Sequence, residues 1–322
     1  MKSMKILLIN LLLFTFISCE EDFNPYGDYI EKFAFTCILK SDQHFQTATL
    51  FRSYRPDGYD PLAYTEDPSV IGADIRIWYN DSVFVFRDTS VTRVDTTRYK
   101  TPLRYYYNDN FVVGYRKPIE LEVLLPNGKR LRSSSVTPDQ IDFNDESAVL
   151  IPSGTKQIVQ VIWNIQDAET YFLPKMTFRY KQNINGQIVE KSKDVPIKYV
   201  DQSGDLVPVY PVPSALVTVV YDLSAITKTL EEISEGDPNK QGYSIYQKLI
   251  FTVTALDLPT SRYVSSTSGT IDDLTVSVDV SDYTNIEGGF GLFGSYSMQN
   301  YTKLRFLEDY IETFGYNFIV EN

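Results

Sequence analysis

Apolar and polar residues alternate along much of the chain, with the period of two that is typical of half-buried β-strands. The clearest example lies at residues 70–77, where isoleucine and alanine alternate with glycine and charged residues. The same alternation, with runs of aromatic and β-branched residues, predicts strands at 30–39, 46–53, 71–77, 83–86, 119–125, 129–135, 158–163, 171–180, 188–191, 216–221, 249–256 and 274–280.

Short polar turns join some of these strands into hairpins. Asn127-Gly128 and Asn185-Gly186 each follow a strand-like run, and the glycine supplies the positive φ that a two-residue hairpin turn requires. The segment 88–110 shows no clear alternation, so we predict an irregular structure there, although it contains the run Tyr105-Tyr106-Tyr107.

One segment has the period of a helix, at residues 223–234. Its apolar face consists of Leu223, Ile226, Leu230 and Ile233. Asp222 can cap the start, and Gly236 followed by Pro238 ends the segment. With one or two short helices among many strands, we predict an all-β protein built from β-sandwiches rather than a parallel α/β sheet.

The order of these segments predicts two domains. The predicted divisions are a signal peptide at 1–18, a tether at 19–29, an N-terminal β-sandwich at 30–138, a linker at 139–147 and a C-terminal β-sandwich at 148–322 with the helix inserted. The segment 54–69 is a long loop with three prolines, which is either a functional loop or a variable insertion without a role.

The first 22 residues carry a targeting pattern. Lys2 and Lys5 precede an apolar run at 6–17 that is too short to span a bilayer and has the length of a signal-peptide core. The run ends at Ser18-Cys19, and Glu20-Glu21-Asp22 follows. This arrangement resembles the lipobox of bacterial lipoproteins, which implies cleavage before Cys19 and acylation of its thiol. The alternative is an ordinary secretory signal with a chance cysteine.

The net charge of the mature chain excludes some classes of binding partner. Without the two lysines of the signal segment, 28 basic and 42 acidic side chains remain, a net charge of −14. So acidic a chain, with no basic run, is a poor candidate for binding nucleic acid or anionic headgroups electrostatically. Acylation of Cys19 leaves Cys37 without an intramolecular partner, and we expect Cys37 to be a buried small apolar residue.

Few residues have the pattern of a catalytic or metal site. His44 is the only histidine, it has no nucleophile motif nearby, and we interpret it as a surface residue. Two groups of carboxylates could bind calcium or act as paired acids: Asp57, Asp60, Glu66 and Asp67 in the long loop, and Asp272, Asp273, Asp279 and Asp282 near the C-terminal strands. Neither group matches a calcium loop or a glycosidase context, so solvated charge is the preferred interpretation. We expect no catalytic residue, no metal and no cofactor.

A glycine-rich segment at 288–294 interleaves Phe290, Leu292 and Phe293 with glycines. It lacks the lysine and Ser/Thr of a phosphate-binding loop. Two interpretations remain open. Either the glycines let the backbone pack closely with the three apolar side chains buried, which we favour, or those side chains form a docking surface for a partner.

Several segments together resemble the DUF4249 lipoproteins of Bacteroidetes. The segments that carry the resemblance are 19–22, 70–77, 119–123 with the 127–128 turn and 136–138, and 285–294. The resemblance implies a two-domain β protein whose first domain is similar to transthyretin-like or carboxypeptidase-regulatory sandwiches. It also implies an outer-membrane lipoprotein that accompanies a TonB-dependent transporter. The tail at 303–322 extends beyond the family pattern.

From these observations we expect a non-enzymatic lipoprotein on the outer membrane. The acidic run after Cys19 resembles the surface-export signal of Bacteroidetes lipoproteins, which implies that the protein faces the cell exterior. The expected role is to assist a TonB-dependent transporter in handling a ligand. The alternatives are an adhesin or glycan-binding module, for which exposed members of the 24 tyrosines would be suited, and a hydrolase that uses loop carboxylates.

Overall fold

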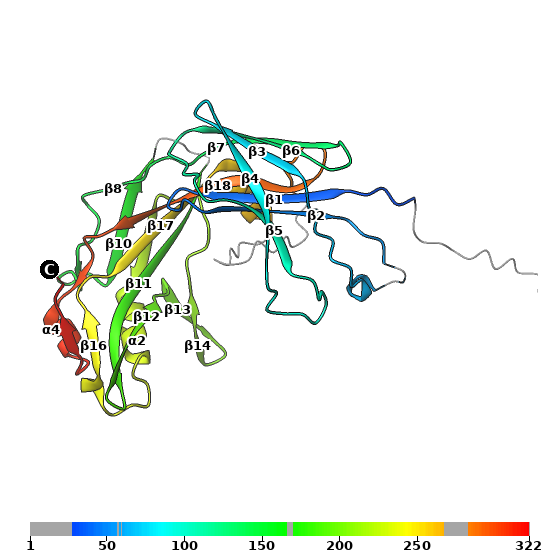
Figure 1. The fold of residues 1–322 in the computed structure, drawn as a ribbon. Helices are drawn as coiled ribbons and strands as arrows, with labels where there is room; N and C mark the ends of the chain where they lie inside the picture. The colour runs from blue at the N-terminus through cyan, green and yellow to red at the C-terminus, as the bar shows by residue number, and fades with distance from the viewer. Residues whose placement is uncertain (1–27, 57, 59, 166–169, 267–282, 322) are drawn as a thin grey trace, which may run out of the picture.

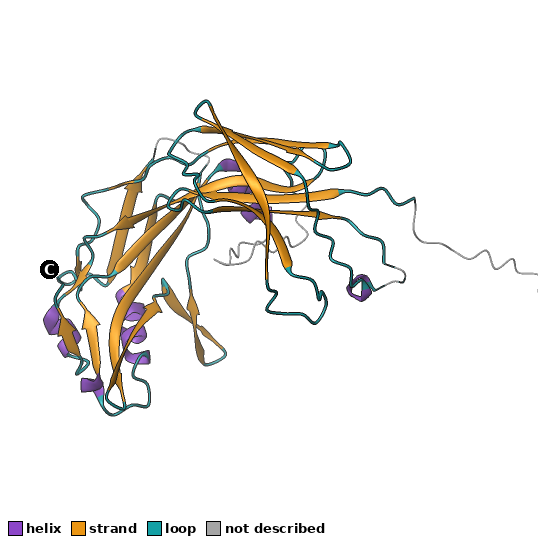
Figure 2. Cartoon of the chain, viewed as in Figure 1, coloured by secondary structure: helices purple, strands orange, loops and turns teal. Residues whose placement is uncertain are grey.

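The computed structural model describes residues 28–56, 58, 60–165, 170–266 and 283–321. Strands make up 48% and helices 11% of the described residues, which confirms the prediction of an all-β, sandwich-like protein. Figures 1 and 2 show two strand-rich halves that meet at an angle. The narrower likeness of the first half to transthyretin-like sandwiches stays a prediction, and the strand predicted at 274–280 lies outside the described residues.

One sheet of 13 strands runs through both halves. Its members in the first half are β1 (Phe33–Lys40), β2 (Gln46–Arg52), β3 (Asp74–Tyr79), β4 (Ser82–Val91), β5 (Leu103–Asn108), β6 (Pro118–Leu124) and β7 (Arg130–Val136). Its members in the second half are β11 (Tyr171–Ile184), β12 (Gln187–Asp194), β16 (Tyr243–Tyr246), β17 (Ile250–Leu256), β18 (Phe290–Tyr301) and β20 (Asn317–Ile319).

Smaller sheets and helices complete the second half. The remaining strands are β8 (Asp142–Phe143), β9 (Leu150–Ile151), β10 (Ile158–Asn164), β13 (Lys198–Gln202), β14 (Asp205–Val209), β15 (Thr218–Asp222) and β19 (Arg305–Phe306). The helices are α2 (Leu223–Glu232), α3 (Leu258–Ser266) and α4 (Glu308–Glu312), with 3-10 turns η2 (Pro61–Ala63) and η3 (Lys240–Gly242). Among the described residues, no helix is both long enough and apolar enough to cross a bilayer.

Strand β18 connects the two halves. Its residues 290–296 pair in parallel with β1, and its residues 296–301 pair antiparallel with β17. Phe293 therefore lies in the core of the first half, whereas Tyr301 lies in the core of the second half. The predicted division, which gave all of 148–322 to the second domain, is wrong at this strand, because β18 completes both halves.

Each half has its own apolar core. In the first half, alternate residues of β1, including Phe33, Phe35 and Leu39, face inward together with Ile75 and Ile77 of β3. Cys37 belongs to the same core and is a free thiol with 1% of its surface exposed, as expected.

The second core forms around the aromatic side chains of several strands. It includes Trp163, Phe172, Phe178, Tyr221 and Phe251. Helix α2 covers this core with its predicted apolar face, since Ile226 and Leu230 are completely buried. Asp222 occupies the N-cap position of α2, but its side chain makes no capping hydrogen bond.

The predicted linker at 139–147 is instead packed into the structure. Asp139 has 4% of its surface exposed and its carboxylate lies 2.9 Å from Nε of Arg116, while Ile141 belongs to the second core. The hydroxyl of Ser147 bonds both backbone groups of Ile162, accepting from N at 2.9 Å and donating to O at 3.1 Å. These polar residues looked solvated in the sequence, but each has a partner in the fold, so the segment is a joint between strands rather than a free linker.

The segment 88–110 also differs from its prediction. Strand β4 continues to Val91, and the three tyrosines lie in β5, which pairs with β4 and β2. Tyr106 points inward with 2% of its surface exposed, whereas Tyr105 and Tyr107 are half-buried on the outer face. Identical residues on both faces conceal the alternation that the prediction depended on.

The glycines at 288–294 allow close contact between backbones, as the favoured interpretation expected. A Cβ on Gly289 would lie 2.7 Å from the carbonyl oxygen of Phe33, and one on Gly288 would lie 2.6 Å from that of Arg130. At Gly291 the backbone has φ +108°, and an added Cβ would overlap the carbonyl oxygen of Phe35. Only glycine can occupy this position next to β1 without a shift of the backbone.

We expect Gly291→Val to destabilise the protein by at least about 1–3 kcal/mol, the cost of a strained φ alone, with the overlap on Phe35 adding to it. Gly58→Val is the matched control, because no atom lies within 4 Å of its added Cβ and its φ is not positive. Thermal unfolding followed by circular dichroism measures both. Equal melting temperatures for the two variants would contradict the close approach at Gly291.

Candidate functional site

The three apolar residues proposed for docking differ in their exposure to solvent. Leu292 and Phe293 have 2% and 0% of their surface exposed, so neither can contact a partner. Phe290 has 46% of its surface exposed, and the ammonium group of Lys32 lies 4.9 Å from the centre of its ring. Only Phe290 therefore remains available at the surface. Cys19 lies outside the described residues.

The described carboxylates of the long loop do not converge on one point. The carboxylate of Asp60 accepts a hydrogen bond from N of Leu62 at 2.8 Å, and that of Glu66 accepts one from the hydroxyl of Tyr64 at 3.2 Å. Asp67 is half-buried and binds other partners. Asp57, Asp272, Asp273, Asp279 and Asp282 lie outside the described residues, and His44 is exposed.

The carboxylate of Asp67 connects the long loop to the β4–β5 connection. Its carboxylate accepts from the hydroxyls of Ser69 at 2.6 Å and Thr101 at 2.9 Å, and it pairs with Arg93 at 2.8 Å. Partial burial acts to raise the pKa of Asp67, but these donors and the charge of Arg93 outweigh it and hold the pKa below its usual value. Within the described part of the chain, no group of three or more His, Cys, Asp or Glu residues could hold a metal ion.

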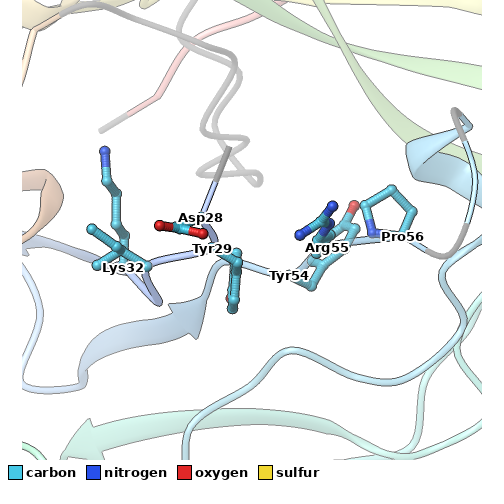
Figure 3. Close-up of a pocket in the computed structure, with 7 residues that line it drawn as sticks. Asp28, Tyr29, Lys32, Tyr54, Arg55 and Pro56 are labelled. Carbon is cyan, nitrogen blue, oxygen red and sulfur yellow. The ribbon is translucent and has the colours of Figure 1, made fainter. Parts of the chain in front are cut away.

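A shallow pocket lies where the chain enters the first strand. It has a volume of about 420 Å³ and is lined by Asp28, Tyr29, Ile30, Lys32, Tyr54, Arg55 and Pro56 (Figure 3). Ser53 holds its two segments together, because its N–H donates to the carbonyl of Lys32 at 2.7 Å and its hydroxyl accepts from N of Lys32 at 2.9 Å. Tyr29 also donates to the carbonyl of Ser53. These bonds fix the first described residues of the chain to the end of β2.

A larger groove lies on the outer face of β3, β6 and β7. We call it the Trp78 groove; it has a volume of about 720 Å³ and is lined by Trp78, Glu120, Leu121, Glu122, Arg132, Ser133, Ser134, Asn285 and Glu287. Because Ile75 and Ile77 point into the core, the intervening Arg76 and the following Trp78 point outward. Trp78 pairs with Glu120, and Glu120 pairs with Ser134, so these three side chains form one row across the strands.

The charges of the Trp78 groove are unequally compensated. The carboxylate of Glu122 binds Nη1 of Arg130 at 2.5 Å and Nε of Arg132 at 3.1 Å. Glu120 and Glu287 are exposed and have no ion-pair partner among the described residues. The groove therefore offers two uncompensated carboxylates and a half-buried indole.

A buried carboxylate lies at the joint between the halves. Asp257, at the end of β17, has 2% of its surface exposed. Its Oδ2 accepts from the hydroxyls of Ser135 in β7 at 2.6 Å and Ser295 in β18 at 3.0 Å, and its Oδ1 accepts from N of Thr260 at 3.0 Å. Burial raises the pKa of Asp257, since loss of water outweighs these donors.

Comparison with known proteins gives no assignment, since no protein-family model and no curated protein matches the chain. The candidate sites therefore depend on the geometry of the chain itself. Neither Trp78 nor Asp257 stands out from the sequence as a site residue. The alternation in β3 could have placed Trp78 on the outer face, but nothing local indicates that Asp257 meets Ser135 across 122 residues.

We expect the stability of the wild type relative to Asp257→Asn to fall as the pH rises from about 4 towards 7. The folded-state pKa of Asp257 is raised above the unfolded value of about 3.9, so the native state binds a proton more tightly, and that advantage is lost as the carboxyl ionises. Urea unfolding at several pH values measures the difference.

Asp67→Asn serves as the control with the opposite sign. The pKa of Asp67 is lowered in the fold, so its carboxylate stabilises the native state above the unfolded pKa and loses that effect as the pH falls through the folded value. A wild-type advantage over Asp257→Asn that grows with pH would show that Asp257 is stabilised in its ionised form.

Proposed function

We propose that this protein is a non-enzymatic lipoprotein of the outer membrane, acylated at Cys19 and facing the cell exterior, that handles a ligand beside a TonB-dependent transporter. The observation that carries the proposal is the segment 1–22, with its basic start, short apolar run, Ser18-Cys19 and acidic continuation. The resemblance to DUF4249 lipoproteins supplies the transporter as the partner.

The geometry of the chain end is compatible with a short tether. The hydrogen bonds between Ser53 and Lys32 attach the start of the described chain to the first half. Eight residues lie between Cys19 and Asp28, which makes nine steps along the chain. At about 3.3–3.6 Å per step these span at most about 32 Å. The end of the first half that carries the pocket of Figure 3 would then lie closest to the lipid.

Exposed apolar side chains on the second half favour a protein partner. They lie on β14 and the segment that follows it, and they are Leu206, Tyr210, Val212, Leu216 and Val217. Val212 and Leu216 have 66% and 65% of their surface exposed. Prolines at 208, 211 and 213 restrict the backbone there, so that little conformational entropy is lost when a partner binds.

The arrangement of the loop carboxylates supports a role without catalysis. Asp60, Glu66 and Asp67 each bind a local partner within the loop or the neighbouring β4–β5 connection. A hydrolase would need two carboxylates that face one substrate from a shared cleft.

Cys19→Ala should release the protein from the membrane fraction, because the acyl acceptor is the thiol and the acidic body provides no substitute. Two acyl chains, at about 0.8 kcal/mol per buried CH₂, anchor a protein firmly. Cys37→Ala is the matched control and should stay membrane-bound, since Cys37 is buried in the first core. Fractionation of cells that express each variant measures this, and equal retention of both variants would refute the lipid anchor.

Val212→Ser with Leu216→Ser should reduce co-purification with a TonB-dependent transporter from solubilised outer membranes by tenfold or more, since two exposed apolar side chains would be lost from the contact. Val83→Ser with Val85→Ser is the control, because these valines have 47% and 48% of their surface exposed on a different face. Quantitative mass spectrometry of the recovered transporter is the measurement. If the control lowers recovery as much as the test variant, Val212 and Leu216 are not the contact.

A further inference from the structure

We infer that the Trp78 groove is a saccharide-binding site, in which a sugar ring stacks on the indole of Trp78 and its hydroxyls bond the carboxylates of Glu120 and Glu287. The inference deepens the proposed ligand-handling role by naming the class of ligand, and it depends on that role. Three properties of the groove carry it: the position of Trp78, the mixture of donors and acceptors, and the rigid backbone beneath them.

Trp78 presents an aromatic surface that the fold does not use. It lies on the outer face of β3, and among the described residues no aromatic ring or cation packs on its indole. The only other tryptophan, Trp163, is completely buried and packs edge-on against Phe172. An indole at the wall of an open groove can take the apolar face of a sugar ring, which gains contact area without the loss of a buried hydrogen bond.

The polar groups of the groove suit a polyol. Glu120 and Glu287 are acceptors only, Arg132 is a donor only, and the hydroxyl of Ser134 can act as either. A sugar hydroxyl donates one hydrogen bond and accepts others, so neighbouring hydroxyls can use both kinds of group. The two uncompensated carboxylates disfavour an anion. Arg132 is already paired with Glu122, so its charge does not repel a cation, and an organic cation is the competing class of ligand that the tetralysine titration tests.

The groove is held in shape before any ligand arrives. Arg132 and Glu287 exchange two backbone hydrogen bonds, at 3.1 and 2.8 Å, which attach residue 287 to β7. The side-chain amide of Asn285 bonds the backbone of Phe293 twice, at 2.6 and 2.9 Å. Side chains on such a framework lose little entropy on binding, so weak individual contacts can add up to measurable affinity.

The size of the groove indicates more than one sugar unit. Its volume of about 720 Å³ lies in the upper part of the usual range for ligand sites, which is about 300–1,000 Å³. The groove crosses the strands from Trp78 on β3 to Glu287 beside β7, so that an oligosaccharide could lie over β6 and β7.

Intrinsic fluorescence offers a direct test, because Trp163 is buried and Trp78 is the tryptophan that a surface ligand can reach. The full-length lipoprotein in detergent would be titrated with cellohexaose, xylohexaose, mannohexaose and chitohexaose, with tetralysine as a cationic probe. We expect at least one hexasaccharide to change the fluorescence saturably, with an affinity that varies less than twofold between low and high salt. A response to tetralysine alone, or to none of the probes, would overturn the inference.

Variants locate the site by isothermal titration calorimetry with the responding hexasaccharide. We expect Trp78→Ala to weaken binding tenfold or more, Trp78→Phe to weaken it less, and Glu120→Gln with Glu287→Gln to weaken it several-fold. Val83→Ala is the control, since Val83 pairs with Trp78 across the strands but does not line the groove. Unchanged affinity in folded Trp78→Ala protein, as judged by its melting temperature, would overturn the assignment.

The outcome is separable from that of the proposed function. Membrane retention through Cys19 and recovery of a transporter do not involve Trp78. A lipoprotein that fractionates with the outer membrane and recovers a transporter but binds no hexasaccharide refutes the saccharide site alone. A protein that binds a hexasaccharide at Trp78 but is released in soluble form refutes the anchor and leaves the site standing.

Discussion

The main-chain pairing of β18 is the constraint on which the rest of the structure depends. Its first part extends the sheet of the first half beside β1, and its second part extends the sheet of the second half beside β17. The two ladders meet at Tyr296, so one strand belongs to both cores. Because β18 follows most of the chain in sequence, neither core is complete until the last tenth of the chain is in place.

The glycines before and within β18 make this position possible. The carbonyls of Phe33 and Phe35 in β1 and Arg130 in β7 approach so closely that a side chain at 288, 289 or 291 would displace them. Two hydrogen bonds between the side chain of Asn285 and the backbone of Phe293 align the same segment. The glycine-rich stretch is therefore primarily a structural element, and only the exposed ring of Phe290 remains to contact another molecule.

The contact between β7 and the segment that contains β18 forms both the buried site of Asp257 and the Trp78 groove. Where β18 passes β7, Asp257 accepts hydrogen bonds from Ser135 and Ser295 and connects three strands through one buried carboxylate. On the opposite face of β7, the pairing of Arg132 with Glu287 adds a wall to the row that contains Trp78. The buried carboxylate of Asp257 on one face of β7 and the polar groove on the other therefore depend on the same contact. This contact explains why the backbone beneath the groove is rigid.

Much of this protein can be derived from its sequence alone, because local patterns determine local structure. Alternation of apolar residues predicted most strands, the Asn-Gly turns predicted the hairpins β6–β7 and β11–β12, and the spacing of Ile226 and Leu230 predicted α2. The proposed targeting signal around Cys19 also depends on a local pattern and stays a prediction. Only the tertiary structure decided the partners of β18, the burial of the segment 139–147, the strand that contains the three tyrosines, and the Trp78 groove. Each of these depends on residues far apart in sequence, such as Ser135 and Asp257 or Arg132 and Glu287, and long-range pairing leaves no periodic signal in either segment.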